Sequence, residues 1–313
     1  MAPDLPAALL GATVVVNLSM AVLTGASLAS RWLAASSSQW AMRNLERLRR
    51  TGLAAVTAAL LAYVTVLWLE SASMAEVAVW EAAPAMHAVL TATHYGFAWI
   101  IGGIALAAVT MVTALRWPPQ RRPAADLVRL GAIGVFLYSR SMVSHAGAGG
   151  DFTWAVAADW IHLVLISVWV GEVLVAGFIT LRQGSGMPAL DGPERARYTQ
   201  ALSTTATVAV AGIVATGVIS AWRGLGGLDN VTGNPYATVL LLKIVLVAIA
   251  IALGGLNRFL VMPSLLADLR TAHRSSTKQE RKFVFILQIE AFVLVAALVL
   301  AAVLSATSPP AAG

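Results

Sequence analysis

Residues 283–305 read FVFILQIEAFVLVAALVLAAVLS, an apolar stretch whose one charged side chain is Glu290. About 20 apolar residues are enough for an α-helix to cross the hydrocarbon core of a bilayer. A chain within lipid can form only helices or a closed barrel, because each backbone polar group must be hydrogen bonded inside the protein. This stretch is too long and too continuously apolar for a barrel strand. It therefore predicts a transmembrane helix.

Comparable stretches recur along the whole chain of 313 residues, which is 58% hydrophobic and 12% charged. Soluble proteins average about 25% charged residues. We therefore expect an all-α, polytopic bundle of about eight spans that forms one integral membrane domain over residues 1–313. The first span lacks a basic segment before it, so we expect a retained helix rather than a cleaved signal peptide. The expected spans are 7–29, 52–69, 87–115, 129–147, 159–181, 201–222, 237–261 and 283–305.

The basic residues indicate how the chain is oriented. Of the 21 Lys and Arg residues, 18 follow the first, third, fifth or seventh span, whereas acidic residues dominate the alternate loops. The positive-inside rule makes the basic side cytoplasmic and puts both termini on the outer side of the membrane, which is the periplasm if the membrane is a bacterial inner membrane. The net charge of +6 is thereby explained by topology, and we expect no nucleic-acid partner.

Potential metal ligands gather at the predicted outer ends of the spans. Imidazole suits copper, zinc, iron and nickel, and thioether selects copper, while the absence of cysteine excludes a thiolate site. His145 and His162 are the leading ligands, with His94 as the third; Asp159 either ligates or orients His162. In the alternative interpretation, these are ordinary interfacial side chains held by hydrogen bonds. The candidates are His87, His94, Met142, His145, Asp159 and His162.

Helical spacing supports this grouping. His87 and His94 are seven residues apart in one expected span, and residues at that spacing share a helix face. Met142 and His145 are three residues apart, and the same spacing recurs farther along the chain at Asp159 and His162. We expect His145 and His162 to lie at similar depth.

Four charged residues lie well away from the ends of the expected spans, where ionisable groups are costly and are functional candidates by default. They either pair with one another inside the bundle or form a translocation path below the histidines, in which the carboxylates pass on a cation or take up protons. These residues are Arg140, Glu172, Lys243 and Glu290.

The second half of the chain resembles the copper resistance protein D family of bacterial inner-membrane proteins. The resemblance covers about residues 139–305 and rests on DWIHLVLISVWVGEVL (159–174), ATGVISAWRG (215–224), NPYATVLLLKIVLVAIAIALGGLNRFLVMP (234–263), Glu290 and the SHA of 144–146. Glu172 and Ala237 depart from the family pattern, which has Gly at both places. The first three spans carry no specific signature.

The resemblance implies movement of copper, as Cu⁺ or Cu²⁺, from the periplasm toward the cytoplasm, with periplasmic partners of the copper resistance C kind. No nucleotide-binding motif is present in the sequence, so we expect neither ATP-driven transport nor enzymatic activity. Two alternatives stay open. One is a membrane b-type haem protein with His94 and His145 or His162 as axial ligands. The other is a copper-binding platform that does not transport.

The orientation is testable with an impermeant thiol reagent on intact cells. Single cysteines placed between Arg43 and Arg50, or within 268–282, should resist the reagent because those loops are predicted to be cytoplasmic. Cysteines at Glu76 or Gly149 should react. The reverse pattern of labelling would overturn the orientation and the outward position of the histidines.

Overall fold

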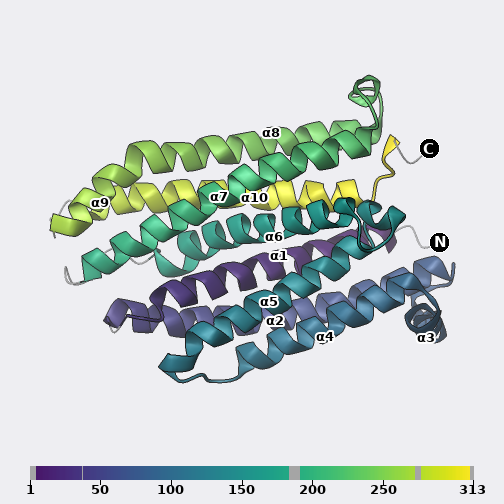
Figure 1. The fold of residues 1–313 in the computed structure, drawn as a ribbon, viewed down its shortest axis with the longest axis horizontal. Helices are drawn as coiled ribbons and strands as arrows, with labels where there is room; N and C mark the ends of the chain where they lie inside the picture. Colours follow the sequence, from purple (N-terminus) through teal and green to yellow (C-terminus); the bar gives the residue numbers. More distant parts are fainter. Residues whose placement is uncertain (1–4, 37, 183–190, 272–275, 311–313) are drawn as a thin grey trace.

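The computed structural model describes residues 5–36, 38–182, 191–271 and 276–310, and within these ranges it is a bundle of helices without strands (Figure 1). The expected all-α class is confirmed. The helices are α1 (Leu5–Leu33), α2 (Gln39–Met74), α3 (Ala83–Ala92), α4 (His94–Ala114), α5 (Arg122–Met142), α6 (Trp154–Val175), α7 (Gly192–Leu225), α8 (Pro235–Leu256), α9 (Met262–Thr271) and α10 (Ser276–Ser305). Short π-helical turns extend α6 through Ala176–Thr180 and join α8 to α9 through Asn257–Val261.

Seven of the helical segments in the described part of the chain are long and apolar enough to cross a membrane. The remaining expected span, 129–147, corresponds to α5. This helix runs beside α4 and α6 but carries Asp126, Arg129 and Arg140. The structure begins α1 and ends α10 at the same end of the bundle (Figure 1). We call it the terminal end. The opposite end, which holds α9 and the Arg- and Lys-rich connections, is the basic end.

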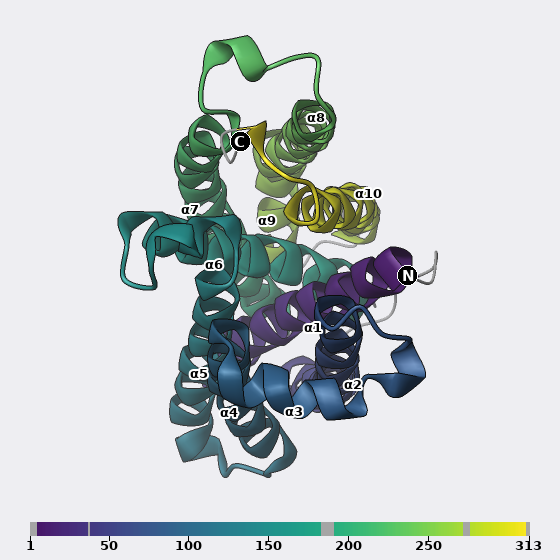
Figure 2. The same cartoon turned by 90° about the vertical axis from the view of Figure 1, so that its right-hand side faces the viewer.

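The expected single span over 87–115 is wrong, because the chain breaks into α3 and α4. Thr93 is extended, with φ −121° and ψ 153°, and its side chain accepts a hydrogen bond from the backbone N–H of Gly96 at 3.0 Å. A Thr in this conformation is an N-cap that begins a new helix. Figure 2 shows α3 lying across the terminal end rather than along the bundle. His87 and His94 consequently belong to different helices and do not share a face.

Two glycines let α1 and α6 cross in backbone contact. A Cβ atom on Gly171 would lie 1.9 Å from the carbonyl oxygen of Ala21, and one on Gly25 would lie 2.2 Å from the carbonyl group of Gly171. In lipid, the hydrophobic effect does not drive helices together. Small residues at a crossing allow close van der Waals packing, which stabilises the contact instead. The sequence can pack α1 against α6 this closely only because both positions lack a side chain.

The crossing lies between two clusters of buried apolar residues. One cluster joins α1 to α2, α4 and α5, and includes Met20, Tyr63 and Phe136. The other joins α1 and α6 to α7, α8 and α10, and includes Trp169 and Leu294. In the end-on view, α1 and α6 lie between the two groups of helices (Figure 2). The pair α1–α6 therefore holds the two halves of the chain together.

Polar contacts add to this packing. The indole N–H of Trp160 on α6 donates to the carbonyl of Gly134 on α5 at 2.8 Å. Nearer the basic end, Arg195 on α7 forms a buried ion pair with Glu280 on α10. A buried pair of this kind fixes one helix against another, because loss of either partner leaves an uncompensated charge.

We predict that Gly171→Ala destabilises the protein by more than the about 1–3 kcal/mol typical of overpacking, because the new methyl group meets rigid backbone. The control is Gly11→Ala, at a position on α1 where a Cβ would have no neighbour within 4 Å. Thermal denaturation in detergent should show a large loss of stability for the first variant and none for the second. Equal stability of Gly171→Ala and the wild-type protein would refute the backbone contact.

Candidate functional site

The connection between α5 and α6 at the terminal end carries the first group of candidate ligands. His145 begins a 3-10 turn, His145–Gly149, after α5 has ended at Met142. The turn folds back tightly, since a Cβ on Gly147 would lie 2.0 Å from the carbonyl oxygen of Met142. The expectation that Met142 and His145 share one helix face is therefore wrong. Met142 is buried with 4% exposure in the last turn of α5, whereas His145 is exposed.

Asp151, in the same connection, binds the imidazole at the start of α4. The Nε2 atom of His94 lies 2.8 Å from Oδ1 of Asp151, and the two side chains are 53% and 19% exposed. The hydroxyl of Tyr138 on α5 donates to the backbone carbonyl of Asp151 at 2.8 Å and holds this residue in place. An imidazole and a carboxylate, both of them metal-ligand types, are thus paired at the surface of the terminal end.

Asp159 and His162 lie on one helix, α6, as expected. Asp159 accepts a hydrogen bond from the Ser144 hydroxyl at 3.0 Å, which ties the residue before His145 to α6. A second electrostatic contact comes from Lys243 on α8, whose charge lies within reach of Asp159. The start of α6 is therefore a junction between the α5–α6 connection and α8.

The hydrogen bond of His162 fixes which ring nitrogen is free. His162 is buried, and its Nδ1 lies 2.8 Å from Oγ1 of Thr216 on α7. The single hydroxyl hydrogen of Thr216 is directed to the carbonyl of Gly212 at 2.7 Å. With the hydroxyl in this direction, Nδ1 of His162 is the donor, and a neutral ring in this tautomer keeps its lone pair on Nε2. That is a tautomer able to bind a metal ion through Nε2.

The four intramembrane charges form no ion pairs with one another in the described part of the chain. Arg140 is within electrostatic reach of Glu70 on α2. Glu172 is 1% exposed; the Thr205 hydroxyl faces it, but neither carboxylate oxygen has a hydrogen bond of ordinary geometry. Glu290 instead accepts a hydrogen bond from the indole N–H of Trp169. Lys243 faces Asp159 on α6, so the four residues have other neighbours than one another in this part of the chain.

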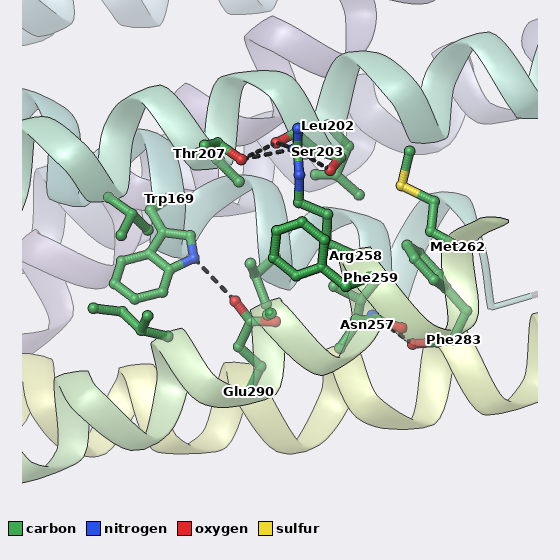
Figure 3. Close-up of a pocket in the computed structure, with 17 residues that line it drawn as sticks. Trp169, Leu202, Ser203, Thr207, Asn257, Arg258, Phe259, Met262, Phe283 and Glu290 are labelled. Atoms are coloured by element: carbon green, nitrogen blue, oxygen red, sulfur yellow. Dashed lines mark hydrogen bonds between the residues drawn. The ribbon is translucent and has the colours of Figure 1, made fainter.

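Glu290 and Trp169 border a partly open cavity of about 200 Å³ between α6, α7, α8, α10 and the turn Asn257–Val261 (Figure 3). Across this cavity, Nη1 of Arg258 donates to Oγ of Ser203 at 2.6 Å and to Oγ1 of Thr207 at 2.7 Å. The remaining walls are mainly apolar side chains such as Phe283. The interior thus holds a carboxyl group and a guanidinium group on opposite walls.

The structure brings the candidate ligands to one end of the bundle but not into one cluster. Among the residues it describes, no three His, Asp or Glu side chains converge in a way that could hold a metal ion. His87 is exposed on α3. The binding partners Asp151 and Ser144 were not anticipated, because they lie in a connection whose path the helical spacing does not determine.

The comparisons with known proteins match both halves of the chain. Residues 196–304 match the family model of copper resistance protein D, and residues 2–154 match that of the copper resistance protein D-like, N-terminal domain. The chain is also similar to the copper resistance protein D of Pseudomonas syringae pv. tomato, with 28% identity over 247 residues, which is 77% of this chain and 78% of that protein. The similarity therefore extends to the first helices, which carried no recognisable signature.

We predict that Lys243 and Asp159 stabilise one another. Lys243→Met alone should lower stability, because it removes one of the two positive charges, Lys243 and Arg223, that act on the Asp159 carboxylate. Addition of Asp159→Asn should recover part of the loss, with a coupling energy of about 0.5–3 kcal/mol. Thermal denaturation of the two single variants and the double variant measures this coupling. Strictly additive losses would show that the two side chains do not interact.

Proposed function

Because this chain belongs to the copper resistance protein D family, we propose that it moves copper ions across the bacterial inner membrane and captures them at the terminal end of the bundle. Its multi-pass helical architecture suits transport, since polar residues in the interior mark ion paths in membrane proteins. In this proposal the terminal end faces the periplasm and the basic end faces the cytoplasm, as the positive-inside rule requires.

The observation that carries the proposal is the contact between His94 and Asp151. It joins α4 to the α5–α6 connection, is partly exposed, and combines an imidazole with a carboxylate at 2.8 Å. Either the pair ligates copper directly or Asp151 orients His94 so that its other ring nitrogen faces the ion. His145 lies in the same connection and is exposed, so it is the nearest additional ligand along the chain.

His162 is the candidate for the next position inward. It is buried on α6 and keeps Nε2 available for a metal ion when Thr216 accepts the Nδ1 proton. Copper bound at His94 and His145 would have to pass the charge of Lys243, which Asp159 offsets. Ligands that meet only when the ion arrives suit a transporter, because an ion held by a complete and rigid site is slow to leave.

A periplasmic copper-binding protein of the copper resistance C kind is the partner that this proposal requires at the terminal end. Phe152 and Trp154, which flank the connection beside Asp151, are 94% and 91% exposed. Exposed aromatic rings at this level suit either the membrane interface or a docked protein. A docked partner would supply the ligands that complete the coordination of copper during transfer.

A visible absorption spectrum of the purified protein separates this proposal from the b-type haem alternative. A copper-handling protein should lack a Soret band when it is purified from cells that can make haem. A strong band that disappears in the His94→Ala and His162→Ala variants would support haem ligation instead.

We predict that His145→Ala and His162→Ala each lower copper affinity strongly while the folded yield stays near that of the wild type. Asp151→Asn should lower affinity by about 10–100-fold if the carboxylate orients His94. The matched control is Asp229→Asn, an exposed aspartate in the α7–α8 connection at the same end. Isothermal titration and copper accumulation in cells measure these effects. Unchanged copper stoichiometry and affinity in a His145→Ala/His162→Ala double variant would place the site elsewhere.

A further inference from the structure

Glu290, beside the cavity at Trp169, is a buried carboxyl group without an ion-pair partner among the described residues. Glu290 is 2% exposed, and Oε1 accepts the indole N–H of Trp169 at 2.9 Å. Gly254 on α8 allows this fit, since a Cβ there would lie 3.2 Å from Oε1. Among the described residues, no charged side chain forms an ion pair with this carboxyl group. The group thus lies against helix backbone and open space.

The charges on the neighbouring elements do not neutralise Glu290. The nearest candidate across the cavity is Arg258, whose Nη1 is directed at Ser203 and Thr207 on α7. Helices α1, α6, α8, α9 and α10, together with the two π-helical turns, are the elements that pack around it or contain it. Their other titratable groups are Arg31, Asp159, His162, Glu172, Tyr236, Lys243, Asp268, Arg270, Lys278, Glu280, Arg281 and Lys282. Helix α7 forms the wall across the cavity, and its titratable groups are Glu194, Arg195, Arg197, Tyr198 and Arg223.

A carboxylate at this depth without a paired cation is far more costly than a neutral carboxylic acid. The group must therefore carry a proton or hold a cation for much of the time. The cavity offers one oxygen of Glu290, the hydroxyls of Ser203 and Thr207, and the buried Oδ1 of Asn257, which has no hydrogen-bond partner among the described residues. These are too few anionic or soft ligands for a metal ion but sufficient partners for water.

We propose that Glu290 is a proton-binding site, reached through water in this cavity from the basic end of the bundle. A cavity of about 200 Å³ has room for roughly six water molecules at about 30 Å³ each. Arg258 and Asn257 belong to the turn that leads into α9, which lies at the basic end (Figure 1). The polar atoms of the cavity thus extend from Glu290 toward that end.

This inference rests on the proposed function for its purpose, because a proton released or taken up at Glu290 would balance the charge of a copper ion that crosses the membrane. The chemistry is simple: the O–H bond of the carboxylic acid breaks, the proton passes to water, and the carboxylate remains. The approach of a copper ion favours release, and its departure favours renewed protonation. The indole N–H of Trp169 donates to Oε1 of Glu290 and holds the carboxyl group at the cavity wall.

Dicyclohexylcarbodiimide tests the site without copper. This apolar reagent adds to protonated carboxyl groups that it can reach within membrane proteins, and mass spectrometry of peptides locates the adduct. Glu290 should be labelled at low pH and should lose its label as the pH is raised. Glu172 is the internal control, because it is equally buried but does not line the cavity, and it should stay unlabelled. The Glu290→Gln variant should show no adduct on this peptide.

Three results would overturn the inference. They are the absence of an adduct on Glu290 at every pH, equal labelling of Glu172 and Glu290, and protection of Glu290 by Na⁺ or K⁺ at constant pH, which would identify a cation site. Because the labelling requires no copper, a protein that fails to transport copper but shows the expected labelling would contradict the proposed function and leave the proton site intact.

Discussion

The crossing of α1 and α6 at Gly25 and Gly171 is the constraint on which the rest of the bundle depends. Backbone contact at this point leaves no room for a methyl group on either helix. The two apolar clusters are built on either side of this pair, so each half of the chain takes its position from it. The same helix α6 carries Asp159, His162, Trp169 and Glu172. The central packing contact and several of the candidate polar residues therefore share one helix.

The polar residues at the terminal end of the bundle differ from those in its interior. Imidazoles and carboxylates that suit capture of an ion lie at the terminal end, where the α5–α6 connection is partly exposed. Farther in, Lys243 faces Asp159 and Arg140 faces Glu70, whereas Glu290 forms no ion pair among the described residues and accepts a hydrogen bond from Trp169. Isolated buried charges are tolerated in membranes chiefly where they bind or conduct ions. In the proposed function, His162 on α6 would bind the copper ion, and Glu290 on α10 would bind the proton.

Hydropathy was sufficient to predict the helical class and nearly all the spans, because a bilayer admits few other structures. It did not predict the break at Thr93, because a threonine between apolar residues is compatible with both the interior of a helix and an N-cap. Only its backbone conformation distinguishes the two. Helical spacing correctly put Asp159 and His162 on one helix, yet it failed for Met142 and His145, because α5 ends between them. Contacts across helices, such as Trp169 with Glu290, depend on rotations and depths that spacing along one chain does not contain.

The central claim, that copper is captured by histidines at the terminal end, is tested most directly by X-ray absorption spectroscopy of the copper-loaded protein. We expect nitrogen and oxygen ligands around copper, with the outer-shell scattering typical of imidazole rings, because the donors at this end include the exposed His87, His94 and His145 and the partly exposed Asp151. A shell made of sulfur alone would assign capture to methionines instead. That result, or a purified protein that retains no copper under loading conditions, would contradict the claim.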